Sequence, residues 1–467
     1  MTTRSRVWTF AIVSLALFMA MLDNLVVITA LPAIKRALGA SVSDLEWTVN
    51  AYTLAFAVLM MTGSALGDRF GRKRVFLAGV AVFSLGSALA ALSDSSTQLL
   101  ISRAFQGLGA AFVTPLTLTI LARAFPPHQR AAAIGLWSGI SGLGLAIGPL
   151  VGGAIVNGVA WNAIFWINVP IGALVVLLGV LRLEESHGDR QPLDFPGLLL
   201  AGTGLFGITF GLIRGNALGW TSAAILASFV AGALLLAAFM WRERRAASPM
   251  LNLHLFAARG FSVSNGVGFL MSAGMFGSIF LLTLYIQQIQ GASPLTAGIR
   301  TMPWTGTIML VAPVAGIIAG RIGSRPVVLL GMTLQAAALL WIGAVAQIST
   351  PYSTLLPAFI LGGVGMGLTF APLSAAVINA IAPNLEGQAS GAYNSIRELG
   401  GVFGIAILGA VFQHIVTVPT AASFMAGFRV AVFAGAGIVT AGVLLSVLLP
   451  AASAARSQAA VPAEAVA

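Results

Sequence analysis

The chain contains no cysteine, and only 8% of its 467 residues are charged. The missing cysteines exclude disulfide bonds and thiolate metal sites. The charged fraction is about a third of that of an ordinary soluble domain, while 58% of the residues are hydrophobic. The four histidines are too far apart to form the short spacings that hold a catalytic metal. This composition predicts a polytopic membrane protein that needs neither a metal nor an organic cofactor.

Apolar segments long enough to cross a bilayer occur fourteen times. They cover about residues 7–31, 47–66, 75–92, 98–122, 131–156, 163–181, 196–213, 221–241, 261–287, 298–319, 327–347, 354–380, 389–412 and 429–450. The first segment follows Arg4 and Arg6 as a signal peptide would, but its apolar stretch is too long for one. We therefore expect an all-α fold with fourteen transmembrane helices.

Positive charge is distributed unevenly over the loops, and the net charge is +11. Most of the 24 Lys and Arg fall in loops on the side of the two termini. Because cytoplasmic loops carry an excess of Lys and Arg, both termini are predicted to be cytoplasmic. The expected location is the bacterial cytoplasmic (inner) membrane, with the lipid bilayer as partner, and the charge requires no nucleic acid.

The sequence repeats itself at a constant offset of 256 residues. The matching positions are Gly107 with Gly363, Gly109 with Gly365, Trp137 with Tyr393, Gly144 with Gly400 and Gly148 with Gly404. Repeated halves around a central path are a transporter design. The chain is therefore predicted to contain a six-helix bundle (1–190), two inserted linker helices (191–245), a second six-helix bundle (246–450) and a disordered tail (451–467).

Two acidic residues fall inside predicted membrane helices, Asp23 and Glu398, and the other acids are assigned to loops or helix ends. A carboxylate at such depth is costly unless it is paired, protonated or facing water. Arg103 is also inside a helix and cannot lose its proton, so it needs an anion or several carbonyls. Asp23 is a candidate partner for Arg103, whereas Glu398 has Arg397 beside it.

Glycines form a stripe along one predicted helix, because Gly144, Gly148 and Gly152 recur every fourth residue. With Pro149 and Gly153 they indicate a bent, smooth-faced helix that another helix can approach closely. The loop from Leu66 to Arg74 is a short basic turn. Its candidate gate residues are Asp68, Arg69, Gly71, Arg72 and Lys73.

Five stretches resemble motifs of the major facilitator superfamily, specifically its fourteen-helix drug:proton antiporter branch. They are LGDRFGRK (66–73), the Leu99–Ala111 segment, GLAIGPLVGG (144–153), MLDNLVVITALP (21–32) and WNAIFWINVPIG (161–172), the last with Asn162 where the branch usually has Arg. The resemblance implies alternating access of two bundles. It also implies that Asp23 binds the proton or a cationic substrate, that Arg103 tunes Asp23, and that Asp68 with its Arg neighbours latches a cytoplasmic gate.

The predicted function is proton-driven export of lipophilic drugs, cationic ones among them. Candidate proton-coupling residues are Asp23, Arg103 and Glu398; candidate cavity residues are Asn24, Tyr52, Gln106, Trp137, Tyr393, Asn394 and Arg397. The alternative is an exporter of one neutral or anionic metabolite, for which Arg103 and Arg397 would matter more. An enzyme or a passive channel is not expected, and neither is ATP-driven transport. Whether an adaptor or outer-membrane partner takes part stays open.

Overall fold

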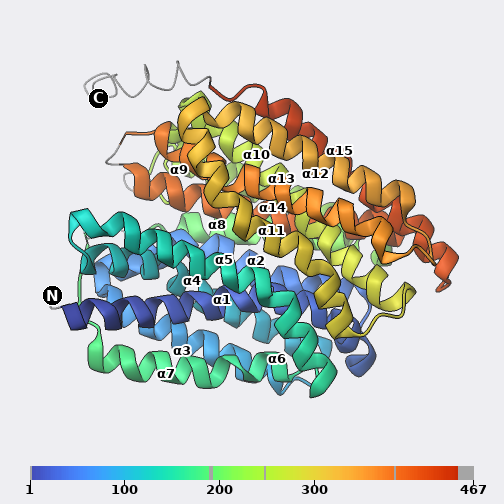
Figure 1. The fold of residues 1–467 in the computed structure, drawn as a ribbon, viewed down its shortest axis with the longest axis horizontal. Coiled ribbons are helices and arrows are strands. Elements are labelled where there is room, and N and C mark those ends of the chain that lie inside the picture. The colour runs from blue at the N-terminus through green and yellow to red at the C-terminus, as the bar shows by residue number, and fades with distance from the viewer. Residues whose placement is uncertain (1–2, 189–192, 247–248, 383–384, 451–467) are drawn as a thin grey trace. The chain divides into compact units, whose positions relative to one another are not determined.

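The computed structural model describes residues 3–188, 193–246, 249–382 and 385–450 (Figure 1). Within these ranges, fourteen helical segments are long and apolar enough to cross a membrane, which confirms the predicted number. The first unit below contains α1 (Thr3–Leu38), α2 (Val42–Phe70), α3 (Arg72–Ala91), α4 (Ser96–Ala124), α5 (Pro127–Gly158), α6 (Ala163–Trp166), α7 (Asn168–Arg182), α8 (Phe195–Leu218) and α9 (Ala223–Glu243). The predicted tail (451–467) lies outside the described residues, as does the predicted boundary at residue 190.

The remaining helices are α10 (Arg259–Leu284), α11 (Pro294–Ile322), α12 (Ser324–Val345), α13 (Tyr352–Asn379), α14 (Glu386–Ile415) and α15 (Ala421–Ser446), with a short helix at Leu253–Ala257 and a π-helical turn at Tyr285–Ile289. The chain divides into two compact units. The first holds α1 to α9, apart from residues 215–217, together with residues 286–299. The second holds residues 215–217, α10, α11 from Arg300 onward, and α12 to α15.

Glycines determine how closely helices pack in the first unit. Gly107 of α4 lies against the Tyr52 carbonyl of α2, so a methyl group at this position would overlap that oxygen. Gly109 of α4 lies in the same way against the backbone of α3 at Phe83. Glycine is therefore required on two faces of α4, because any side chain would push a neighbouring helix away.

The second unit repeats these contacts with equivalent glycines. Gly363 of α13 lies against the Trp304 carbonyl of α11, and Gly365 lies against Gly331 of α12. Gly400 and Gly404 bring α14 against α10, just as Gly144 and Gly148 bring α5 against α1. The predicted correspondence between the two halves is confirmed, because each glycine of the repeat packs on the equivalent helix.

Single glycines also form equivalent tight turns in the two units. Gly71 separates α2 from α3 with φ +111°, and Gly323 separates α11 from α12 with φ +92°. Residues with a side chain rarely adopt a positive φ, so these turns favour glycine. The short turn predicted around Gly71 is therefore present, and it has a counterpart in the second unit.

Two sequence-based assignments are wrong. The second span was expected to begin at about residue 47, whereas α2 begins at Val42, so Glu46 lies inside that helix and is completely buried. The capping box of Ser41 and Asp44 starts the helix earlier than the apolar pattern indicates. The last span was expected to begin at Arg429, whereas α15 begins at Ala421. Arg429 lies within that helix, where its Nε donates to the Gly343 carbonyl at 3.0 Å.

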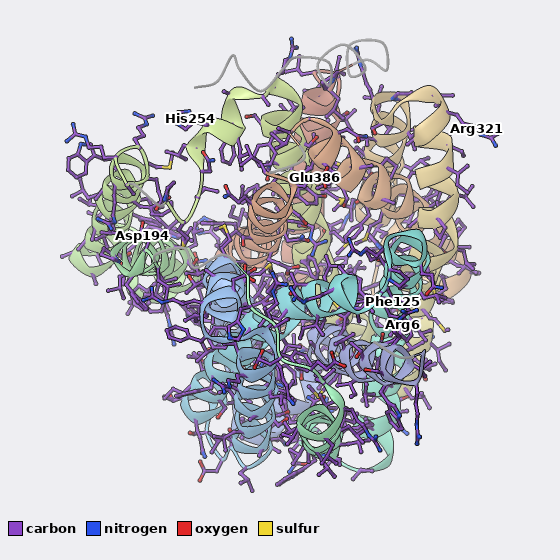
Figure 2. All side chains as sticks on the ribbon, turned by 90° about the vertical axis from the view of Figure 1, so that its left-hand side faces the viewer. Arg6, Phe125, Asp194, His254, Arg321 and Glu386 are labelled. Atoms are coloured by element: carbon purple, nitrogen blue, oxygen red, sulfur yellow. The ribbon has the colours of Figure 1, made fainter. Side chains whose placement is uncertain are left out.

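The inserted helices α8 and α9 are joined at one end by an ion pair, in which the Asp194 side chain is 2% exposed and the Arg242 side chain 37%. Asp194, labelled in Figure 2, caps α8. It accepts hydrogen bonds from Gly197 N at 2.9 Å and from Arg242 Nε of α9 at 2.8 Å. Burial alone would raise the pKa of Asp194. The hydrogen bonds from Arg242, Gly197 and Glu243, together with the charge of Arg242, more than offset burial and lower that pKa below 3.8.

Because the pKa of Asp194 is lowered, its stabilising effect is complete above pH 3.8 and is lost as the pH falls through the lower, folded-state value. Asp194→Asn is expected to cost about 1.5–3 kcal/mol at neutral pH, since hydrogen bonds to a charged group are lost. Hydrogen exchange of residues 223–243 between pH 5 and pH 2.5 measures the effect. The exposed Asp94 is the control, and an equal change in Asp94→Asn would contradict the assignment.

Candidate functional site

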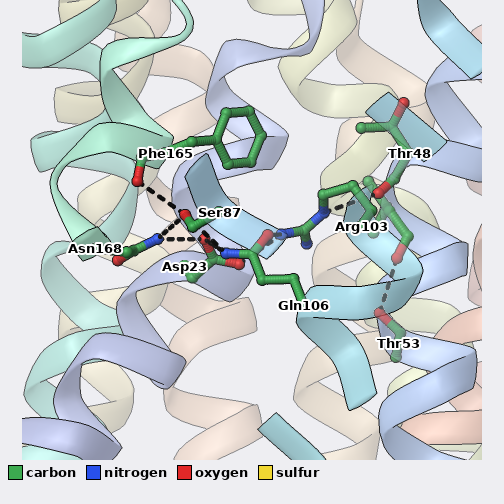
Figure 3. Close-up of polar contacts among 9 residues, drawn as sticks. Asp23, Thr48, Thr53, Ser87, Arg103, Gln106, Phe165 and Asn168 are labelled. Carbon is green, nitrogen blue, oxygen red and sulfur yellow. Dashed lines mark hydrogen bonds and ion pairs between the residues drawn. The ribbon is translucent and has the colours of Figure 1, made fainter. Parts of the chain in front are cut away.

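The first unit encloses a polar cluster around Asp23 of α1 (Figure 3). The Asp23 carboxylate accepts hydrogen bonds from Arg103 Nη1 at 2.6 Å, from Gln106 Nε2 at 2.8 Å and from Asn168 Nδ2 at 2.9 Å. The side chains of Asp23 and Arg103 are each only 1% exposed. The contact between the two charges that the sequence suggested is therefore present, in the interior of the unit.

Arg103 is held from three sides. Its Nη1 also donates to Gln106 Oε1 at 2.6 Å, and its Nε donates to the Thr48 carbonyl of α2 at 3.2 Å. The guanidinium carbon lies 4.3 Å from the centre of the Tyr52 ring. The aromatic face and the carbonyl both favour the cation. Two predicted cavity residues, Tyr52 and Gln106, thus contact the ion pair.

Ser87 and Asn168 complete the cluster. The Ser87 hydroxyl accepts from Gln106 Nε2 at 3.2 Å and from Asn168 Nδ2 at 3.0 Å, and it donates to the Phe165 carbonyl at 2.8 Å. Sequence reasoning did not select either residue. Both are polar residues within predicted membrane segments, which could have marked them as candidates. Neither was chosen, because neither carries a charge.

Close backbone approaches position the cluster. Gly86 of α3 lies against the backbone nitrogen of Gln106, which places the neighbouring Ser87 beside α4. On α5, Gly144 lies against Met21 and Gly148 against Leu25, so the glycine stripe contacts α1 on both sides of Asp23. The predicted stripe is therefore a packing face for the helix that carries the buried carboxylate.

The last glycine of the stripe, Gly152, also packs on α1, at Val26, whereas the adjacent Gly153 faces a different segment. Gly153 lies against the backbone of Pro294, and the Pro149 carbonyl lies against Gly298. In the same segment, Gln287 Nε2 donates to the Thr29 carbonyl of α1 at 2.8 Å. Residues 286–299 therefore pack on α1 and α5 through backbone contacts that exclude side chains at Gly153 and Gly298.

The gate residues lie at the end of the first unit where α1 begins. Arg6 and Phe125 mark this end in Figure 2. The Arg182 guanidinium carbon lies 5.5 Å from the centre of the Trp8 ring. Arg72 Nε donates to Asp68 Oδ1 at 2.7 Å. Lys73 Nζ donates to the Val180 and Leu183 carbonyls of the chain leaving α7. Arg69 is exposed, and its guanidinium lies 5.5 Å from the Phe70 ring.

The first turn of α3 is capped from a distant part of the sequence. Glu185 Oε1 accepts from Lys73 N at 2.9 Å, and Glu185 Oε2 accepts from Arg74 N at 3.2 Å. The carboxylate lies so close to Gly71 that a side chain there would meet it. Asp68 pairs with Arg72, whereas Glu185 occupies the N-terminus of α3.

Glu185→Gln is expected to lower the stability of the α2–α3 turn by about 0.5–2 kcal/mol, the usual range for a lost helix cap. The amide keeps one acceptor oxygen but loses the charge that favours a helix N-terminus. Hydrogen exchange of residues 71–76 measures the effect. Glu184 is the matched control, since it is exposed and accepts a long hydrogen bond of 3.4 Å from the Ser5 hydroxyl. Equal protection in Glu185→Gln and the native protein would contradict the capping role.

In the second unit, four predicted site residues lie on α14. Arg397 Nη2 donates to Glu398 Oε1 at 2.6 Å. Tyr393 is buried and its ring lies against Gly268 of α10. Asn394 is half-buried, and its amide nitrogen donates to the Ser390 carbonyl of the same helix.

The two remaining cavity candidates are in the first unit. Asn24 is buried on α1 next to Asp23. Trp137 of α5 is partly buried and packs against the hydrophobic core of this unit. The structure therefore brings Asp23, Tyr52, Arg103 and Gln106 together, whereas Trp137 takes part in core packing.

Comparison with known proteins identifies the fold and the relatives. The family model described as the Major Facilitator Superfamily matches residues 13–241, 195–405 and 266–465. A bacterial homologue of the human lysosomal transporter Spinster has a TM-score of 0.70 and 16% identity, covering 99% of this chain and 100% of that one. The POT family transporter PepTSo has a TM-score of 0.71 and 14% identity, with coverage of 98% of this chain and 99% of that one. These two structures support the fold alone.

Relatives with higher identity are named for resistance and export. The tetracenomycin C resistance and export protein of Streptomyces glaucescens is 35% identical over 411 residues, which are 87% of this chain and 76% of the relative. The methylenomycin A resistance protein of Streptomyces coelicolor is 36% identical over 402 residues, with coverage of 85% and 83%. The multidrug resistance protein Stp of Mycobacterium tuberculosis is 33% identical over 410 residues, with coverage of 87% and 76%. The chain is an integral membrane transporter and belongs to the Major Facilitator Superfamily, in its multidrug efflux branch.

Proposed function

We propose that this transporter exchanges protons for lipophilic compounds and exports them across the bacterial cytoplasmic membrane, with both termini in the cytoplasm. The observation that carries the proposal is the enclosed Asp23–Arg103 pair. Relatives named for the export of tetracenomycin C and for methylenomycin A and multidrug resistance support the direction and the substrate class. The gate role of Asp68 and its neighbours belongs to the same proposal.

The pair can couple proton binding to a structural change. An ionised Asp23 balances the charge of Arg103, and the carboxylate receives three hydrogen bonds. A proton on Asp23 would remove that balance, so Arg103 would need another anion or carbonyls. Thr48 and Tyr52 of α2 already contact Arg103. A movement of Arg103 would therefore displace α2 as well as α1 and α4.

The proton gradient supplies enough free energy for export. Moving one charge down a membrane potential provides about 2.3 kcal/mol per 100 mV. A tenfold concentration ratio of a neutral compound costs about 1.4 kcal/mol. One proton per substrate would therefore support an accumulation of more than tenfold outside the cell.

Uptake into everted vesicles tests this proposal. The vesicle interior corresponds to the outside of the cell, so an acidic interior should drive accumulation of an exported dye. We expect nigericin, which collapses the pH gradient, to reduce accumulation at least tenfold. Uptake that is the same with and without a gradient would show a carrier that is not coupled to protons.

The alternative substrate class, a neutral or anionic metabolite, is favoured by one observation. In the Arg397–Glu398 pair of the second unit, the arginine side chain is 16% exposed and the glutamate 7%. The cation is therefore the more accessible partner.

A further inference from the structure

We propose that Arg397 and Phe370 of the second unit form a recognition site for neutral or singly anionic aromatic compounds, and that compounds with a net positive charge are poor substrates. The inference rests on the proposed export function and assigns the substrate's charge class. The proposed site lies on the face that α13 and α14 contribute within the second unit.

The donors of Arg397 are only partly used. Nη2 of Arg397 donates to Glu398 Oε1 at 2.6 Å. Among the residues that the structure describes, Nε and Nη1 of Arg397 donate to none. Nε and Nη1 are not among the buried atoms that lack a hydrogen-bond partner. Both nitrogens are therefore accessible from outside the unit's packed interior. A planar fork of donors matches the two oxygens of a carboxylate or the edge of a quinone or phenolate.

An aromatic ring fixes the guanidinium. The Arg397 guanidinium carbon lies 4.7 Å from the centre of the Phe370 ring. One turn earlier on α14, the ring of Tyr393 is held against α10 because Gly268 has no side chain. A flat substrate that reaches Arg397 therefore meets Phe370 beside the charge, and both its ring and its acidic edge find complementary groups.

A cationic substrate finds no comparable partner. Apart from acids in the first and last turns of helices, the described spans contain three carboxylates: Asp23, Glu46 and Glu398. The side chain of Asp23 is 1% exposed and bound by Arg103, while Glu46 is completely buried. Glu398 is bound by Arg397. A cation would have to displace an arginine or enter a closed interior, and both are costly.

Matched anthracene compounds test the charge class. The three probes share one ring system: anthracene-9-carboxylate, 9-anthracenemethanol and the permanently charged (anthracen-9-ylmethyl)trimethylammonium. In everted vesicles with an acidic interior, we expect the native protein to accumulate the carboxylate and the alcohol at least tenfold faster than the cation. Passive trapping cannot explain accumulation of the carboxylate, because an acidic interior excludes a weak acid.

Arg397→Gln is expected to lower carboxylate transport at least tenfold and alcohol transport by less than threefold. Because this variant leaves Glu398 without its cation, the doubly neutral Arg397→Gln/Glu398→Gln variant is measured beside it and should show the same selectivity. Arg300→Gln is the control, since Arg300 also lies over an aromatic ring, that of Tyr352. We expect it to change carboxylate transport by less than threefold.

The outcomes separate the two proposals. Gradient-driven transport in which the cation moves as fast as the carboxylate, or in which Arg397→Gln leaves the order unchanged, overturns the charge class and leaves export intact. If none of the three probes moves with the gradient in the native protein, both the export function and this inference fail.

Discussion

The Asp23→Asn variant is expected to lose proton-driven transport and to be less stable than the native protein by about 3–5 kcal/mol, the usual cost of breaking a buried ion pair. The substitution leaves Arg103 enclosed without its anion, and a guanidinium cannot neutralise itself by losing a proton. Gradient-driven uptake and detergent-solubilised thermal unfolding measure the two losses.

A charge-neutral double variant separates folding from coupling. Asp23→Asn/Arg103→Gln removes both charges, and we expect it to recover most of the stability lost in Asp23→Asn. Transport against a gradient should remain absent, because no carboxylate is left at the site. Proton-driven accumulation by the double variant would contradict the role of Asp23, even if the single variant fails to fold.

Gly107→Ala is expected to lower transport at least tenfold without changing any polar group. The added methyl group would overlap the Tyr52 carbonyl, so α2 and α4 would have to separate. Overpacking of this kind costs about 1–3 kcal/mol. The separation would also move Thr48 and Tyr52 away from Arg103, and such misplacements reduce activity strongly.

The control for Gly107→Ala is Gly437→Ala in α15, where a methyl group would meet nothing within 4 Å. Alanine is favoured over glycine in a helix by about 0.5–1 kcal/mol, so this variant should be at least as stable as the native protein. Equal transport by Gly107→Ala and Gly437→Ala would show that the close approach of α2 and α4 is not needed.

Much of the architecture could be predicted because the bilayer imposes strict requirements on the sequence. Each span needs a long apolar run, and those runs are visible without a structure. The glycine spacing also indicated the repeat, since Gly107 and Gly363 perform the same packing task. Helix ends were less predictable. The Ser41 capping box starts α2 within polar sequence, so Glu46 was assigned outside the span that encloses it.

The site could be predicted in part because charges in a membrane are few. Asp23 and Arg103 were selected for that reason, and their contact follows from the fold. Asn168 and Ser87 were not selected, because an uncharged polar residue in a membrane helix has many possible partners. Glu185 was also unpredictable as the cap of α3, since it lies more than a hundred residues along the chain from Lys73. Contacts of that kind depend on which helices become neighbours.

Proton release on substrate addition tests the central claim most directly. Purified protein in weak buffer with a pH indicator would receive anthracene-9-carboxylate, a pre-neutralised salt that adds no protons itself. The account predicts proton release by the native protein and none by Asp23→Asn/Arg103→Gln, with Gly437→Ala behaving like the native protein. Equal release by the native and double-variant proteins would contradict the account, because the proton would then come from a group other than Asp23.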